Sequence, residues 1–303
     1  MESRFTAELT KPLPALRSLF SIGMTVLALL LTALALLPLL AILVKILLEG
    51  VPQLKWEVLT SLPAPVGLEG VPSGFANAIL GTLTMVGIAS FGSIPIGVLV
   101  AIYLSEFGKQ STLARFVRFG VTILSGVPSI VVGVFAYGVV VLSEWKLGDI
   151  VLKQKGFSAL GGSFALAVIM VPIVVLATEE ALKLVPTHQR LASSALGANH
   201  FQTTFRIVVM AALPGITTGV LLAVARAAGE TAPLIFTALF SQNWPEGLFN
   251  PTPSLSVLIY NYAGSAFVEQ NQLAWSASVI LVGIVLLFNI LSRLATRQRG
   301  KTR

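Results

Sequence analysis

Arg226 and Glu230 are the residues whose chemistry stands out, because they are the only charged side chains between Ile207 and Pro245. An ionised side chain at the centre of a membrane-spanning helix is unfavourable by roughly 2.5 to 3.5 kcal/mol, so such residues usually face a partner, a cavity or a transport route. Residues four positions apart share a helix face, and these two could pair or exchange partners when an anion arrives. The pair therefore favours a transport pathway or a gate.

Two alternatives to this interpretation remain open. The pair could lock its helix to a neighbouring subunit, with the substrate passing elsewhere. Glu230 could also be protonated and act as a neutral hydrogen-bonding group, since burial disfavours the charged form of a carboxyl group. The sequence does not decide among the three.

The chain that must position these residues is strongly apolar. Of its 303 residues, 55% are hydrophobic and 11% are charged, and the mean hydropathy is +0.88. This composition predicts an all-α polytopic membrane protein, because soluble domains carry about 25% charged residues. A spanning helix needs about 20 apolar residues. Six runs meet this length and predict six transmembrane helices, at about 19–43 or 19–48, 75–104, 119–143, 159–177, 207–239 and 273–292.

Lysine and arginine fall unevenly on the two sides of these six spans. Fourteen lie on the side that carries both chain termini and five on the opposite side, and Arg226 completes the total of 20. Because positive residues are retained in the cytoplasm, this bias predicts cytoplasmic N- and C-termini. The tryptophans agree, since all of them lie near predicted outer ends, where an amphipathic ring suits the headgroup layer. They are Trp56, Trp145, Trp244 and Trp275.

Several chemistries are disfavoured by what the sequence lacks. The absence of cysteine excludes disulfides, thiol catalysis and cysteine-based metal sites. His188 and His200 lie twelve residues apart in a polar loop, which does not indicate a metal site. Glu179 and Glu180 are adjacent and point to different helix sides, which disfavours paired acid and base catalysis. With no phosphate-binding loop and no basic stretch interleaved with aromatics, we expect no cofactor, no enzymatic activity and no nucleic-acid partner.

Local patterns indicate how the spans pack and bend. Small residues recur every four positions in the second span, which lets another helix approach closely. Pro128 should bend or open the third span near Ser129. The apolar run Leu255–Ala263 is too short to span and predicts a re-entrant or surface helix, whereas the segment 49–73, rich in Pro and Gly, predicts turns. The small residues are Ala89, Ser93, Gly97, Ala101 and Ser105.

The polar segment between the fourth and fifth spans predicts a short helix, a turn and a second helix. Pro186 ends the preceding helix, and Thr187 is expected to cap the next one. Apolar residues then repeat at four-residue spacing on either side of Gly197, which interrupts the pattern. Such an element either lies at the membrane interface without a partner or docks into a partner's groove, and the pattern alone leaves both open. The repeating residues are Leu191, Ala195, Phe201 and Phe205.

This segment resembles the coupling-loop signature of ABC importer permeases. Ala192 and Ser193 match its small pair, Gly197 its glycine, and Ile207 follows after nine residues. The family's glutamate is replaced by Leu191, and a Leu-Pro pair comes late, at 213–214. The resemblance implies contacts to an ATPase subunit, made here by shape and apolar contact, with charge from Arg190 or Glu180. The residues expected in this contact are Arg190, Leu191, Ala192, Ala195, Gly197 and Phe201.

Within that superfamily, residues 75–293 resemble the PstA family of phosphate permeases. The matching phrases are Pro128–Gly133, Leu184–Pro186 and Ala225–Ala238, the last of which contains Ala-Arg-x-x-Gly-Glu-Thr-Ala-Pro. The paired PstC family shares Arg-x-x-Gly-Glu-Thr without the continuation, which is why PstA is preferred. The resemblance implies that a substrate pathway or gate is formed by Arg226, Glu230, Thr231 and Ser129.

The resemblance also implies a type I ABC importer permease fold in the bacterial inner membrane, and ATP-driven import of inorganic phosphate. The expected partners are the second permease PstC, two copies of the ATPase PstB with its ATP and Mg, and the phosphate-binding protein PstS. The expected organisation is a cytoplasmic segment 1–18, a first span and outer loop 19–74, a permease domain 75–293 with its coupling loop at about 187–206, and a basic tail 294–303.

Two rival functions remain at this stage. A permease for another oxyanion, such as sulfate or molybdate, is possible because an intramembrane arginine does not by itself choose among anions. A carrier or scaffold outside the ABC class is disfavoured, because spans two and three hold no counterpart of Arg226 and Glu230 and because of the coupling-like loop.

Overall fold

A computed structural model of the chain describes residues 15–67, 71–109, 111–147, 150–153 and 156–299. The segments that carry the two termini, and with them the expectation that both are cytoplasmic, lie outside the described residues, as does the side chain of Trp145. The chain divides into two compact units, Met1–Leu48 and Glu49–Arg303. Each is described by itself.

The first unit is the helix α2, Ala15–Gly50, whose last two residues already belong to the second unit. The helix continues through Pro38, and the mean hydropathy of its apolar stretch is 2.9. At 1.5 Å per residue, its 36 residues exceed the length that a bilayer core of about 30 Å requires. The expected first span is confirmed and is longer than the sequence indicated.

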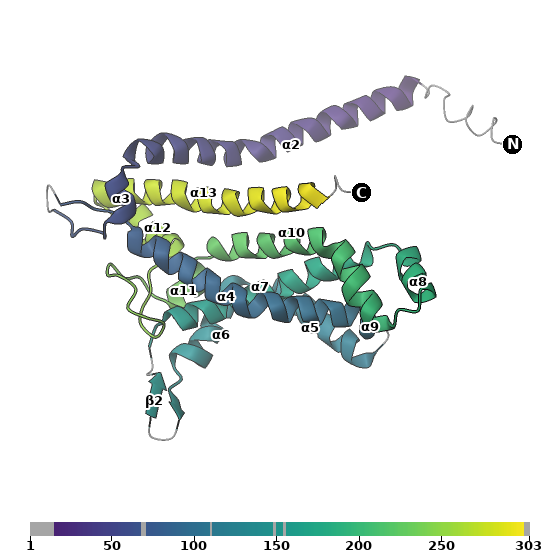
Figure 1. Ribbon diagram of the computed structural model, residues 1–303. Helices are drawn as coiled ribbons and strands as arrows, with labels where there is room; N and C mark the ends of the chain where they lie inside the picture. The colour runs from purple at the N-terminus through teal and green to yellow at the C-terminus, as the bar shows by residue number, and fades with distance from the viewer. Residues whose placement is uncertain (1–14, 68–70, 110, 148–149, 154–155, 300–303) are drawn as a thin grey trace. The chain divides into compact units, whose positions relative to one another are not determined.

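The core of the second unit is built by three long helices that pack on one another (Figure 1). Buried side chains such as Met85, Met170 and Ala227 fill the space between them. A fourth long helix covers this group and packs on α10 and on the short α12. The helices are α4, Ala76–Ile102; α7, Ala159–Lys183; α10, Val209–Ala228; and α13, Val268–Arg299.

The small-residue stripe of α4 is confirmed as a packing surface. All five of its residues are buried, and Ser93 directs its hydroxyl at the sulfur of Met170 on α7, at 3.7 Å. A Cβ added at Gly97 would lie only 2.7 Å from a methyl carbon of Val174. The absence of a side chain there allows α4 and α7 to approach closely.

Five helices of the described chain are long and apolar enough to cross a membrane, and a bent pair supplies a sixth span if it is counted as one. The pair is α5, Thr112–Gly126, followed after Pro128 by α6, Ser129–Ala136, and a π-helical turn η3, Tyr137–Val141, with a bend of 105°. The expected bend at the proline is confirmed. The expected span at about 207–239 is confirmed, but its end is wrong, because its helix α10 ends at Ala228.

The two ends of the second unit differ in what they carry (Figure 1). One end, here called the α8 end, holds α8, Thr187–Ala195, α9, His200–Thr203, and the π-helical turn η4, Thr204–Val208. The opposite end holds α12 and a small antiparallel hairpin. The hairpin strands are β1, Trp145–Leu147, and β2, Ile150–Lys153.

Several expectations for the short segments need correction. The hairpin is an addition to the all-α expectation. The segment 49–73 is not made of turns alone, because it contains the 3-10 turn η1, Val51–Gln53, and the helix α3, Trp56–Thr60. The short run at 255–263 does form a helix, α12, but its side chains Leu255 and Leu258 are buried, so it is not a surface helix.

Candidate functional site

The fifth span is broken beside the charged pair. The Gly229 amide donates to the Arg226 carbonyl at 3.0 Å and the Glu230 amide to the Ala227 carbonyl at 3.2 Å, which closes the last turn of α10. A short helix α11, Ala232–Thr237, then begins with Pro233 in its first turn, where a missing N–H leaves no helical bond unmade. Glu230 therefore sits in an irregular segment at the end of a helix.

Arg226 and Glu230 pair across this break. The Nε atom of Arg226 lies 3.4 Å from Oε1 of Glu230, which agrees with the spacing argument. The two side chains differ in environment, because Arg226 is 57% exposed whereas Glu230 is 14% exposed. The Ser256 hydroxyl of α12 donates to the backbone carbonyl of Glu230 at 2.7 Å and fixes the break from outside the span. A guanidinium exposed on an apolar surface can take a second partner without losing its charge.

The break of the third span lies against the break of the fifth. The helices α6 and α11, each of which restarts its span, pack on one another. The contact is close enough that a Cβ at Gly133 would lie 2.7 Å from the Cα of Pro233. The sequence phrases containing Pro128–Gly133 and Ala225–Ala238 are therefore neighbours in space as well as parts of one resemblance.

A small cavity joins the two breaks. Its lining includes the Arg226 and Ser129 side chains and Ser125 of α5, among apolar residues of α5, α6 and α7. The structure thus brings two of the four expected pathway residues together, while Thr231 and Glu230 do not line this cavity. The cavity measures only about 20 Å³, close to the space for one water molecule. A hydrated oxyanion needs more room than this cavity offers.

The segment expected to couple to an ATPase presents apolar side chains outward at the α8 end. Leu191, Leu196 and Phe201 are exposed, with Leu196 at 90%. Gly197 turns the chain at a φ of +85°, a conformation that favours glycine. The Ser193 and Thr203 hydroxyls, 2.9 Å apart and buried, tie α8 to α9.

Caps at the two helix starts of this segment differ from expectation. The expected cap at Thr187 is wrong: α8 begins after Pro186, which makes no side-chain cap. The second helix, α9, begins at a capping box in which the Asn199 side chain accepts from the Gln202 amide at 2.8 Å and the Gln202 side chain accepts from the Asn199 amide at 3.0 Å. This reciprocal cap stabilises the turn after Gly197.

Arg190 turns inward, which the sequence did not indicate. Its Nη2 donates to Oε1 of Glu106 at 2.9 Å, and further N–H groups donate to the carbonyls of Leu182 and Val185. Glu106 is 3% exposed and lies on the π-helical turn η2, Tyr103–Phe107, at the end of α4. Arg190 therefore fastens α8 to the second span in this structure.

A second ion pair lies beside the first. Glu179 is 2% exposed and accepts from Arg118 of α5 at 2.8 and 3.1 Å, and Lys183 lies 3.1 Å from it. Glu180 is exposed, unlike Glu179, but it pairs with the same Lys183 ammonium at 2.8 Å, so the two adjacent glutamates share one cation. Sequence reasoning missed Glu106, Glu179 and Arg118 because polar residues at the end of a span are usually solvated. A carboxylate directly after a long apolar run was the signal that could have identified the two glutamates.

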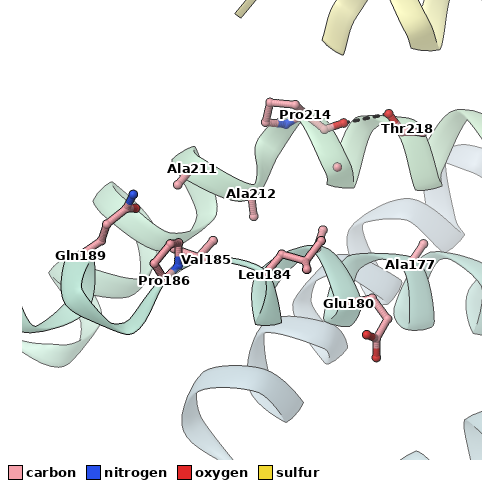
Figure 2. Close-up of a pocket in the computed structure, with 12 residues that line it drawn as sticks. Ala177, Glu180, Leu184, Val185, Pro186, Gln189, Ala211, Ala212, Pro214 and Thr218 are labelled. Atoms are coloured by element: carbon pink, nitrogen blue, oxygen red, sulfur yellow. Dashed lines mark hydrogen bonds between the residues drawn. The ribbon is translucent and has the colours of Figure 1, made fainter. Parts of the chain in front are cut away.

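An apolar groove of about 510 Å³ lies behind α8, between the ends of α7 and α10. Figure 2 shows its two walls: Ala177 on α7 and Leu184 directly after α7, and Ala211 and Pro214 on α10. The Thr218 hydroxyl donates to the Pro214 carbonyl one turn earlier in α10, at 3.0 Å. The groove separates the two helices that enter and leave the α8 end.

Among the described residues, no group of three or more His, Cys, Asp or Glu side chains is arranged to hold a metal ion. His200 instead packs edge-on against the Phe107 ring at 5.0 Å.

Comparison with known proteins links this geometry to a family. The sequence model of the family described as binding-protein-dependent transport system inner membrane component matches residues 93–299. The chain is 41% identical over 254 residues to the phosphate transport system permease protein PstA of Haemophilus influenzae, covering 84% of this chain and 85% of that protein. It is 35% identical over 258 residues to the probable phosphate transport system permease protein PstA of Methanocaldococcus jannaschii, covering 84% and 86%.

Solved structures show the same fold. A chain of a bacterial alginate ABC transporter, crystallised with its alginate pentasaccharide-bound periplasmic protein, superposes with a TM-score of 0.67 at 15% identity, covering 95% of this chain and 98% of that one. The inward-facing MetNI methionine ABC transporter gives a TM-score of 0.55 at 21% identity, covering 74% and 94%. At these identities the likeness concerns the fold alone.

Proposed function

The chain belongs to the family of binding-protein-dependent transport system inner membrane components, in its PstA branch, and on that premise we propose that it is the permease subunit of an ATP-driven ABC importer of inorganic phosphate. It is a multi-pass plasma-membrane protein and a transport subunit, not an enzyme. The observation that carries the proposal is Arg226, a cation that is exposed beside a broken span and that, among the described residues, forms an ion pair with Glu230 alone.

The charged pair is proposed to act as a gate for the anion. While the path is empty, Glu230 occupies the guanidinium of Arg226. A phosphate ion competes with Glu230, because a guanidinium fork matches two phosphate oxygens and a dianion attracts it more strongly than one carboxylate. The small cavity that Arg226 shares with Ser129 opens when α6, together with the α11 on which it packs, moves away from Arg226. Thr231, at the start of α11, follows that movement.

The exposed surfaces of the chain support its assembly with other subunits. An exposed Arg226 in an apolar span requires a second subunit or a path beside it, which supports a heterodimer with a second permease, PstC. The apolar face of Leu191, Leu196 and Phe201 is proposed to dock on one of two ATPase subunits, PstB, which hold the ATP and Mg. A phosphate-binding protein, PstS, delivers the substrate at the opposite end. This arrangement requires the α8 end to be cytoplasmic, as the charge bias predicts.

Movement is proposed to pass from the ATPase into the spans through the Arg190–Glu106 pair. A displacement of α8 is transmitted directly to α4, since the pair joins them, and not only through the chain to α10. Residues 75–293 form the permease domain in this proposal.

Two alternatives remain candidates for the site. In the first, Arg226 and Glu230 only lock the span to the second permease. In the second, the substrate is sulfate or molybdate, because the guanidinium fork also fits those oxyanions. The names of the relatives support phosphate over the other two.

The experiment that tests the substrate is uptake of radiolabelled phosphate by cells that lack this chain and are complemented with it. Uptake that returns with the chain and is unaffected by excess sulfate or molybdate supports the proposal. Uptake that does not return, or that either competitor abolishes, removes phosphate as the substrate while leaving the ABC permease fold in place.

A further inference from the structure

A second cavity at the α8 end has the chemistry of an anion site. It measures about 300 Å³, at the lower end of the range for small-molecule sites. Its charged and hydroxyl-bearing lining comes from four separate segments, and it lies apart from Arg226. The residues are Lys109, Arg118, Lys183 and Arg190, with Thr187 and Glu179.

The net charge of the residues that line this cavity is positive. Four cations line it against one lining carboxylate, Glu179. Even when Glu106, behind Arg190, and Glu180, beside Lys183, are added to the count, four positive groups face three negative ones. Glu106 and Glu179 are almost fully buried against Arg190 and Arg118, whereas the side chain of Lys183 is 50% exposed and accessible to an incoming ligand.

Hydrogen-bond donors remain available after the ion pairs are made. Arg118 uses Nε and Nη2 on Glu179 and Leu104, and within the described chain its Nη1 makes no hydrogen bond. The Lys183 ammonium pairs with Glu179 and Glu180, so the third of its N–H groups has no partner among the described residues. Lys109 is exposed and takes part in none of the ion pairs formed by the described residues. A tetrahedral oxyanion accepts several such bonds at once.

Arg190 does not belong to this donor set. Its guanidinium uses four of its five N–H groups on Glu106 and on two backbone carbonyls, so it contributes mainly charge. The hydroxyl of Thr187, the first residue of α8, adds a donor at a helix N-terminus, where partial positive charge gathers.

We propose that this cavity binds a phosphoryl oxyanion, either free phosphate or the headgroup of an anionic lipid, through Lys109, Lys183 and Arg118. Because Arg118 and Glu179 tie α5 to α7, and because Thr187 and Arg190 of α8 line the same cavity, an occupied cavity holds α8 against α5 and α7. The site is independent of the path at Arg226, and its existence does not depend on which substrate the path carries.

The test uses the full-length chain in its purified transporter complex, in nanodiscs of neutral phosphatidylcholine, with radiolabelled inorganic phosphate as the first probe. A second preparation contains phosphatidylglycerol, whose retention is read by native mass spectrometry. The variants are Lys109→Gln and Lys183→Gln, and the matched control is Arg115→Gln, an exposed cation of the same end that does not line the cavity.

Phosphate binding that weakens about fivefold or more in both variants but not in the control supports the proposal with free phosphate as the ligand. Phosphatidylglycerol retention with that same pattern supports it with a lipid headgroup. In either case Arg226→Ala leaves this binding intact, which separates the site from the transport path. Both probes unchanged in the two variants, or a loss of ATPase association without a change in either probe, overturns the proposal.

Discussion

Arg190 and Glu106 lie 84 residues apart in the chain and form a partly buried ion pair, with Nη2 2.9 Å from Oε1. The pair joins the helix that is proposed to touch the ATPase to the end of the second span. Its acid stands on a π-helical turn, and such turns often mark functional positions. An importer of this architecture therefore has a direct link from α8 to α4.

Replacing either member of this pair should uncouple transport. Arg190→Ala leaves the Glu106 carboxylate buried without its partner, which destabilises a folded protein by roughly 3 to 5 kcal/mol for a fully buried pair and by less here, where Arg190 is partly exposed. We expect Glu106→Ala and Arg190→Ala to lower phosphate uptake alike and the double variant to add little to either. Thermal unfolding of the purified complex and uptake measure both effects.

The outcome that contradicts this linkage is an asymmetric one. If Arg190→Ala abolishes ATPase association while Glu106→Ala leaves association and uptake unchanged, Arg190 contacts the ATPase directly and the inward pair is dispensable.

The exposed apolar face of the coupling segment gives a separate prediction. Leu196→Asp or Phe201→Asp places a charge at a surface that is proposed to be buried against the ATPase, without disturbing the fold of the free subunit. Desolvating that charge should reduce co-purification of the ATPase roughly tenfold or more. Leu113→Asp, at a position in the first turn of α5 that is about as exposed as Phe201, is the control. Equal loss in the control would show that the effect is not specific to this face.

The charged residues show most clearly which features of the site could be predicted from the sequence alone. Arg226 and Glu230 could be found because charge is rare in an apolar run, and their spacing indicated the pair that the structure contains. Arg190 could also be found, but its direction could not, because its partner Glu106 comes from a segment far away in the chain. The outward face at Leu191 and Phe201 followed from four-residue spacing, which is a local property of a helix.

The breaks of the spans were only partly predictable. Pro128 indicated the bend of the third span, since proline removes a backbone donor. The end of α10 was missed because the residues from 207 to 239 are mostly apolar on both sides of the charged pair, and the break depends on Gly229, Pro233 and the Ser256 hydrogen bond to Glu230. Long-range contacts of that kind leave no periodic signal.

The contact between α6 and α11 can be tested through one glycine. Gly133→Val forces a side chain against Pro233, where even a Cβ would lie 2.7 Å from the Cα, and overpacking of this kind destabilises by about 1 to 3 kcal/mol. We expect a lower unfolding temperature and reduced uptake. Gly138→Val is the matched control, because nothing lies within 4 Å of a Cβ at that position in the turn after α6. A stable, fully active Gly133→Val complex would contradict the close packing of the two half-helices.

The substitution Glu230→Gln distinguishes a gating role of the Arg226–Glu230 pair from a purely structural role. The substitution keeps the shape of the side chain but removes the charge that competes with phosphate for Arg226. We expect phosphate to be held more tightly, so that the KM and the maximal rate of uptake both fall, each by roughly threefold to tenfold for a weakened charged hydrogen bond. Uptake kinetics in complemented cells measure this. An increase in KM, or a complex that no longer assembles, would favour the lock.

The most direct measurement of the central claim is phosphate uptake by cells complemented with Arg226→Ala, together with co-purification of the second permease and the ATPase. The gate predicts an assembled complex whose uptake is lowered ten- to hundredfold, and partial uptake with Arg226→Lys, which keeps the charge but not the planar fork. Arg115→Ala, in an exposed arginine of α5, should behave as the unmodified chain. Full uptake by Arg226→Ala, or loss of assembly together with uptake, would contradict a role for this guanidinium in the path.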